Sequence, residues 1–174
     1  YDKTLNILEV SSKSTNPLGV ALSAFNLKVS DDQGKEFLIE NIFQSSKVFE
    51  LGGPYKDLLY TSAKHAKTDE RLKTSGKLLQ FDYNGTIWDL EPKTMFYDWI
   101  YINALRGNEL LSKEILEYNA FTDIEFNHNK SVNCQARSAA IFVTLSAMGC
   151  LNDVLRNKEE FEKIYQQNFQ SSFL

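Results

Sequence analysis

Three polar side chains stand at helical spacing in an otherwise apolar stretch of the chain. Glu40, Gln44 and Lys47 follow one another at i, i+4 and i+7, so a helix over residues 37–50 would carry all three on one face. By spacing alone, a solvated helix face is the plainer interpretation of this stripe, and a reactive site is the alternative.

Two further acids lie among apolar residues. Asp98 is embedded in MFYDWIYINAL and Glu125 in FTDIEF. A carboxylate is costly to bury unless it is paired, so each acid lies either on an exposed face or in a site. Cleavage of a glycosidic bond commonly uses two acids, one that protonates the leaving group and one that stabilises or attacks the sugar cation. The sequence supplies such a pair, but composition alone does not select this reaction.

Other chemistries leave no pattern in the sequence. His65 and His128 stand at no metal-ligand spacing with each other or with a cysteine, so no metal site is predicted. Phosphate-binding, dinucleotide-binding and serine-nucleophile motifs are absent from the sequence, and no cofactor is expected. Gly52 and Gly53 follow a predicted helix, where helix capping is the plain interpretation.

Composition bounds the class of protein. The 174 residues are 43% hydrophobic and 24% charged with a net charge of −4, which fits one globular domain over residues 1–174. The sequence has neither a membrane-spanning run nor a signal peptide, and its two cysteines suggest the reducing cytoplasm. The acidic balance argues against a protein that coats DNA but allows a local basic strip. The strip would consist of Lys64, Lys67, Arg71, Lys73 and Lys77.

The elements that must position these residues are mostly helices. Hydrophobic period and breakers predict helices over residues 37–50, 95–105, 108–118, 136–151 and 152–167. Strands are predicted over 20–29 and 121–126, and the DYNG turn predicts a hairpin between 78–81 and 86–90. We therefore expect a helix-rich α+β domain with a few short strands.

Several segments resemble the NADAR superfamily, whose members have the YbiA-like fold. LSAFNLKV and FLIENIFQSSKVFE resemble its opening motifs and carry Ser23, Phe25, Glu40, Gln44 and Lys47. SAKHAKTDER, DWIYINAL and FTDIEFNHNKSVNCQARSAAIFV are similar to its later motifs. The blocks SSKSTNPLGVALSAFNL and NCQARSAA most resemble the NADAR antitoxins associated with DarT-type DNA ADP-ribosyltransferase toxins. Those antitoxins typically carry a further N-terminal segment, which we expect the sequence that begins at Tyr1 to lack.

The resemblance implies an N-glycosidase that removes ADP-ribose from guanine in DNA and acts as antitoxin to a DNA ADP-ribosyltransferase toxin. ADP-ribosylated DNA, ADP-ribose and the cognate toxin would be its partners, with no membrane and no metal. Two alternatives stay open. One is an N-glycosidase that acts on a ribosylamino-pyrimidine phosphate of the riboflavin pathway. The other is a non-catalytic module that binds ADP-ribose or sequesters the toxin.

The resemblance also implies roles for single residues. Glu40, Lys47 and Glu125 are the predicted catalytic residues, with Lys47 either contacting phosphate or forming a Schiff base. Asp123 stays an alternative to Glu125 because FTDIEFNHN replaces the family's Trp-Gly-Asp-Gly loop, and Lys93 stays an alternative to Lys47. The predicted ligand-binding residues are Ser23, Phe25, Gln44, Gly52, Gly53, Tyr55, Trp88, Lys93, Asp98, Trp99, Asn127 and Asn133.

Overall fold

Helices dominate the computed structural model, which describes residues 4–123 and 135–169. Its helices are α1 (Pro17–Ala21), α2 (Ile39–Ser45), α3 (Ala63–Thr68), α4 (Arg71–Thr74), α5 (Met95–Arg106), α6 (Glu109–Glu114), α7 (Gln135–Ala147), α8 (Leu151–Val154) and α9 (Lys158–Asn168). Two 3₁₀ turns accompany them, η1 (Lys56–Tyr60) and η2 (Ile115–Glu117). Among the described residues, none of the helices combines the length and the apolar composition of a membrane span.

The strands are short and form small separate sheets. They are β1 (Ile7–Glu9), β2 (Lys28–Ser30), β3 (Glu36–Leu38), β4 (Lys47–Phe49), β5 (Leu78–Tyr83), β6 (Thr86–Trp88) and β7 (Ala120–Thr122). β1 pairs with β7 in parallel, and β2 pairs with β3 antiparallel. The third sheet is antiparallel in the order β4-β5-β6, with Lys47 opposite Phe81 and Phe81 opposite Trp88. The fold is therefore α+β, as the sequence predicts.

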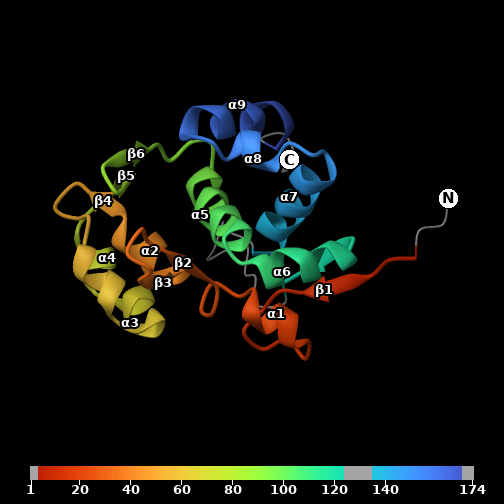
Figure 1. The fold of residues 1–174 in the computed structure, drawn as a ribbon. Coiled ribbons are helices and arrows are strands. Elements are labelled where there is room, and N and C mark those ends of the chain that lie inside the picture. Colours follow the sequence, from red (N-terminus) through yellow and green to blue (C-terminus); the bar gives the residue numbers. More distant parts are fainter. Residues whose placement is uncertain (1–3, 124–134, 170–174) are drawn as a thin grey trace.

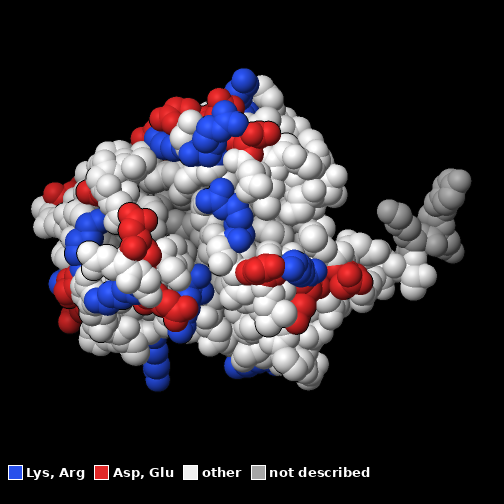
Figure 2. Space-filling model, in the orientation of Figure 1, with Lys and Arg blue, Asp and Glu red and all other residues white. Residues whose placement is uncertain are grey.

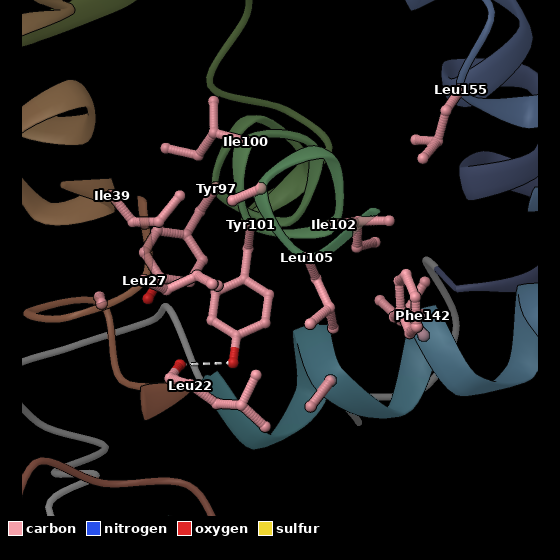
Figure 3. Packing of buried hydrophobic residues seen from close by; sticks show 14 of the residues in the cluster. Leu22, Leu27, Ile39, Tyr97, Ile100, Tyr101, Ile102, Leu105, Phe142 and Leu155 are labelled. Carbon is pink, nitrogen blue, oxygen red and sulfur yellow. Dashed lines mark hydrogen bonds between the residues drawn. The ribbon is translucent and has the colours of Figure 1, made fainter. Parts of the chain in front are cut away.

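Helix α5 lies at the centre of the fold, between the segments α2–β6 on one side and α6 to α9 on the other (Figure 1). It is apolar around most of its circumference, which is the pattern of a helix buried on all sides. Its side chains reach both halves: Tyr97 and Tyr101 point toward Ile39 and Leu22, whereas Leu105 points toward the α7 side (Figure 3). The Tyr101 hydroxyl donates to the Leu22 carbonyl oxygen at 2.7 Å.

One buried carboxylate ties three helices together. Asp98 on α5 forms an ion pair with Arg137 on α7 and accepts hydrogen bonds from Ser138 at 2.5 Å and Tyr165 at 2.6 Å. Thr94, directly before α5, donates to the same carboxylate at 3.0 Å. A buried carboxylate needs such partners because the loss of water is otherwise uncompensated. The Asp98 cluster, formed by these five residues, therefore fixes α7 and α9 against α5.

The structure confirms part of the predicted order of elements. Helix α5 and the β5–β6 hairpin lie where the sequence predicts them. The helix predicted over 108–118 is present as α6 followed directly by η2. The hairpin turn has Asn84 and Gly85 at positive φ, as two-residue hairpins favour. Helix α7 ends at Ala147, four residues earlier than predicted, and the last predicted helix is divided between α8 and α9.

Two predictions on the N-terminal half are wrong. The strand predicted over 20–29 is instead the end of α1 and a turn, with β2 beginning at its last residues. Asn16 caps α1 by accepting a hydrogen bond from the Leu18 amide at 2.9 Å, and Pro17 occupies the first helical position. These two local signals start a helix before the alternating pattern can pair as a strand.

The helix predicted over 37–50 is also wrong, because the segment contains β3, the short helix α2 and β4. Ser45 and Ser46 donate their hydroxyls to the Ile42 carbonyl oxygen at 3.1 and 2.8 Å. Serine side chains that bond the preceding turn compete with helix propagation. The following residues then pair with β5 rather than extend the helix.

Removal of the buried carboxylate tests the Asp98 cluster. We expect Asp98→Ala to lower the free energy of unfolding by about 3–5 kcal/mol, because Arg137 is left buried without its counter-charge. The matched control is Asp153→Ala, which removes the exposed Arg156–Asp153 pair and costs at most about 1 kcal/mol. Urea unfolding followed by circular dichroism measures both. Equal losses in the two variants would contradict the role of the cluster.

Candidate functional site

Glu40 lies in the first turn of α2, and its carboxylate accepts a hydrogen bond from a side chain of the same helix. Gln44 donates from Nε2 to Glu40 Oε1 at 2.8 Å, and the Glu40 amide donates to the Ala24 carbonyl oxygen at 3.1 Å. The two side chains are only 6% and 7% exposed. The solvated-face interpretation of this stripe is therefore wrong, because the polar pair lies inside the protein.

Lys47 joins this pair from the first position of β4, two residues after the end of α2. Its Nζ lies 4.8 Å from the centre of the Phe43 ring, and its charge interacts with that of Glu40. Burial lowers the pKa of Lys47 from 10.5 to about 8, Glu40 opposes this change, and the charge of Lys67 adds to it. An amine with a pKa near 8 is neutral in about one molecule in ten at pH 7.

Tyr97 on α5 faces the same region, although the sequence analysis did not select it. Its ring packs edge-on against Phe43 with centroids 5.4 Å apart. Burial raises the pKa of Tyr97 well above 10, and the negative charges of Glu40 and Asp123 raise it further. Its phenol stays protonated at neutral pH and is a hydrogen-bond donor. The only sequence signal was its position directly before Asp98 in the FYDW block.

The first residue of α7 connects three segments at this site. Gln135 accepts a hydrogen bond from the Ala24 amide at 2.5 Å and donates to Asp123 Oδ2 at 3.2 Å. Asp123, the alternative second acid of the sequence analysis, is therefore held near Tyr97 and the segment before α2. Gln135 was also missed at the sequence level. The predicted residues Glu125, Asn127 and Asn133 lie outside the described residues.

Phe25 and Lys67 form the more exposed side of the site. Lys67 on α3 places its Nζ 5.0 Å from the centre of the Phe25 ring, and both side chains are accessible to solvent. The nearby Ser23 is buried, and its hydroxyl accepts a hydrogen bond from Asn26 at 3.0 Å. Lys67 thus contributes a cation that contacts the Phe25 ring and whose charge acts on the Lys47 amine.

The rest of the predicted basic strip is mixed with acids. Arg71 pairs with Asp57 at 2.7 Å and with Asp69 at 2.9 Å. Lysine, arginine, aspartate and glutamate side chains lie next to one another over α3 and α4 (Figure 2). Lys67, through its contact with Phe25, is the member of the strip that the structure brings to the site.

Gly52 and Gly53 bring the turn after β4 into contact with the strand. Gly53 has φ of +86°, and a Cβ there would overlap the carbonyl oxygen of Lys47. A Cβ at Gly52 would overlap the hydroxyl of Tyr55, which is hydrogen-bonded to Ser75. The two glycines therefore allow a close approach to the backbone of Lys47. Tyr55 itself stacks under Arg71, 4.5 Å from the guanidinium carbon.

Other predicted residues lie apart from this group. Trp88 is buried with its ring 5.6 Å from Phe96 and 5.2 Å from Trp99. Lys93 is exposed before the start of α5, and Asp98 belongs to the cluster that holds α7 and α9. We use the term Glu40–Lys47 site for Glu40, Gln44, Lys47, Tyr97 and Asp123. In the part of the chain that the structure describes, no group of three or more His, Cys, Asp or Glu residues is placed to hold a metal ion.

Comparison with known families gives one finding that covers nearly the whole chain. A family model described as DarT1-associated NADAR antitoxin matches residues 1–172. A search of curated proteins finds no match.

Substitution of Gly53 tests the close approach to Lys47. Gly53→Ala places a Cβ against the Lys47 carbonyl oxygen, whereas Gly85→Ala meets nothing within 4 Å at a similar φ of +81°. Both variants carry the backbone strain of a positive φ, so their difference measures the overlap alone. We expect Gly53→Ala to lose about 1–3 kcal/mol more unfolding free energy than Gly85→Ala. Denaturant unfolding gives the comparison, and equal losses would show that the turn does not pack on β4.

The lowered pKa of Lys47 is tested by removing its charged neighbours. Glu40→Gln removes a charge that favours the ammonium form, so we expect the pKa of Lys47 to fall below 8. Lys67→Met removes a like charge, so we expect that pKa to rise. Lys64→Met, on the same helix, is the control and leaves the pKa unchanged. Titration of ¹³C-labelled lysine by NMR measures each value, and shifts of the opposite sign would refute the assigned causes.

Proposed function

Because the chain belongs to the DarT1-associated NADAR antitoxins, we propose that it removes ADP-ribose from guanine in DNA. The bond to be broken joins the anomeric carbon of the sugar to a guanine nitrogen, and its cleavage restores the base that the toxin modified. The observation that carries the proposal is the Lys47 amine, whose pKa is lowered to about 8 beside the buried Glu40. A reactive amine next to a carboxylate suits chemistry at a sugar carbon.

Glu40 would stabilise the positive charge that develops on the sugar. A carboxylate held in a region with little water stabilises such a charge more strongly than an exposed one. Gln44 fixes the carboxylate by donating from Nε2, whereas its Oε1 is buried without a hydrogen-bond partner among the described residues. That oxygen would accept a hydrogen bond from a ribose hydroxyl and so orient the sugar over Glu40.

Lys47 would act as the nucleophile on the ring-opened sugar. Its neutral amine adds to the anomeric carbon of the open imine form, the bond to the guanine nitrogen breaks, and both lysine protons pass to the departing amine. Water then hydrolyses the lysine imine to release ADP-ribose and the free amine. Lowering the pKa from 10.5 to about 8 raises the neutral fraction at pH 7.5 by about two orders of magnitude.

Two further groups would complete the proposed site. Asp123 stands as the second acid, since Gln135 holds it close to the Tyr97 phenol and Tyr97 also interacts with Glu40. Phe25 would stack on a base of the ligand, and the adjacent Lys67 would contact phosphate. Glu125 stays the other sequence candidate for the second acid, and Asp123→Asn and Glu125→Gln variants compare the two in one assay.

Conservative substitutions at the two central residues test the function. With an oligonucleotide that carries ADP-ribosylated guanine, we expect Glu40→Gln to lower the rate of ADP-ribose release by about 10²-fold or more. Lys47→Arg keeps a cation for phosphate but forms no imine, so we expect it to lose both release and the covalent adduct that borohydride traps. Chromatography of ADP-ribose and mass spectrometry of the protein measure these outcomes.

Glu36→Gln is the matched control for the carboxylate. Glu36 lies exposed on β3 three residues before α2 and pairs with Lys28, so its variant is expected to keep the wild-type rate. Wild-type turnover by Glu40→Gln would refute the proposal. ADP-ribose binding without release by the wild-type protein would instead favour a non-catalytic module. Release only from a ribosylamino-pyrimidine phosphate would favour the riboflavin-pathway alternative.

A further inference from the structure

A cavity lies away from the Glu40–Lys47 site, between the β5–β6 hairpin and the start of α9. It measures about 400 Å³ and lies where Lys158, the first residue of α9, donates to the Ile87 carbonyl oxygen at 2.8 Å. Figure 1 shows the hairpin and α9 next to each other at the edge of the fold. The lining residues are Tyr83, Asn84, Thr86, Trp88, Trp99, Asn157, Lys158 and Glu159. A volume of this size falls within the usual range for small-molecule pockets.

Aromatic faces dominate the chemistry of this cavity. Trp99 and Tyr83 supply the accessible aromatic faces, whereas Trp88 packs behind Trp99 with ring centres 5.2 Å apart, and Lys158 Nζ lies 5.4 Å from the centre of the Trp88 ring. Trp99 and Tyr83 are partly exposed, whereas the Trp88 side chain is 1% exposed. Flat aromatic rings favour a flat ligand, because stacking contacts are made over a whole ring face.

Polar groups around the rings indicate a ligand without net charge. Lys158 and Glu159 contribute one positive and one negative charge, and Asn84 and Asn157 supply amides that both donate and accept. Trp88 Nε1 is buried and has no hydrogen-bond partner among the described residues. An indole N–H is a donor only, and this one is enclosed by the protein, so it is not counted among the groups that a ligand in the cavity would contact. This combination does not select a phosphate, which would require an excess of donors and positive charge.

We propose that the cavity is a binding site for an unmodified nucleobase, separate from the Glu40–Lys47 site. A nucleobase is planar and uncharged and has several donors and acceptors on its edge, and it fits the walls and the amides at once. Packed rings separate the two sites. The centre of the Phe96 ring lies 5.6 Å from that of Trp88 and 6.2 Å from that of Phe43, and Phe43 in turn contacts Lys47. The cavity would therefore hold a different base from the one whose bond is cleaved.

Intrinsic fluorescence reports directly on this cavity. The chain has two tryptophans, and both line the cavity. Excitation at the red edge of the tryptophan band, with N-acetyl-tryptophanamide as the control for absorption by the nucleoside, follows the binding of guanosine, adenosine, cytidine and thymidine. We expect saturable quenching by at least one of them, and the same affinity in Glu40→Gln. The result does not depend on the proposed cleavage reaction, because no modified base is present.

Two neighbouring substitutions on β6 provide a matched pair. Thr86→Phe fills the cavity, whereas Ile87→Phe adds the same ring one residue along, where the side chain points to the other face of the strand. We expect Thr86→Phe to weaken nucleoside binding by about tenfold or more and Ile87→Phe to leave it unchanged. Circular dichroism checks that both variants are folded.

Three outcomes would overturn the assignment. Quenching that is linear and equal in all variants shows collisions only. Equal weakening by Thr86→Phe and Ile87→Phe shows that the ligand binds elsewhere. Saturable binding of N-acetyl-tyrosinamide but of none of the nucleosides shows that the cavity accepts a protein side chain rather than a base.

Discussion

The buried carboxylate of Asp98 is the constraint on which the rest of the structure depends. A carboxylate removed from water must have all its partners present, and here they come from α7, from α9 and from the residue before α5. Tyr97 precedes Asp98 on α5, so its side chain projects about 100° around the helix from that cluster. Fixing Asp98 among its partners therefore also fixes Tyr97 toward α2 and Phe43. The Asp98 cluster and the candidate site therefore lie against two different faces of α5.

The lowered pKa of Lys47 means that the Glu40–Lys47 site reduces the stability of the folded state. The folded-state value of about 8 lies below the ordinary 10.5, so the unfolded chain binds more protons between these values. Stability contributed by this group therefore rises with pH from about 8 to about 10.5, and below pH 8 the partly buried ammonium costs on the order of a few kcal/mol. A residue chosen for stability alone would be apolar here. Gly53 is likewise a residue whose role is to leave room for the Lys47 backbone rather than to add stability.

Local signals predicted some parts of this protein well and others poorly. The long apolar run of α5 and the DYNG turn are strong enough to define their elements from neighbouring residues alone. The segment around Glu40 is different, because its helix ends where serine side chains bond the preceding turn and Lys47 pairs with Phe81 of β5. The structure brings Glu40, Gln44 and Lys47 close together, although the sequence analysis placed them on one helix that does not extend to Lys47. Tyr97 and Gln135 were missed because only tertiary packing brings them there.

The register of the three-stranded sheet also fixes the backbone distance between Lys47 and Trp88. Lys47, Phe81 and Trp88 stand opposite one another on β4, β5 and β6, and adjacent strands lie about 4.8 Å apart. The backbone of the amine and the backbone of the indole are therefore held about 10 Å apart, a span set by hydrogen bonds rather than by flexible side chains. A slip of one residue would turn either side chain to the opposite face of the sheet. The sheet therefore sets a fixed backbone separation between the Glu40–Lys47 site and the Trp88 side of the β5–β6 hairpin.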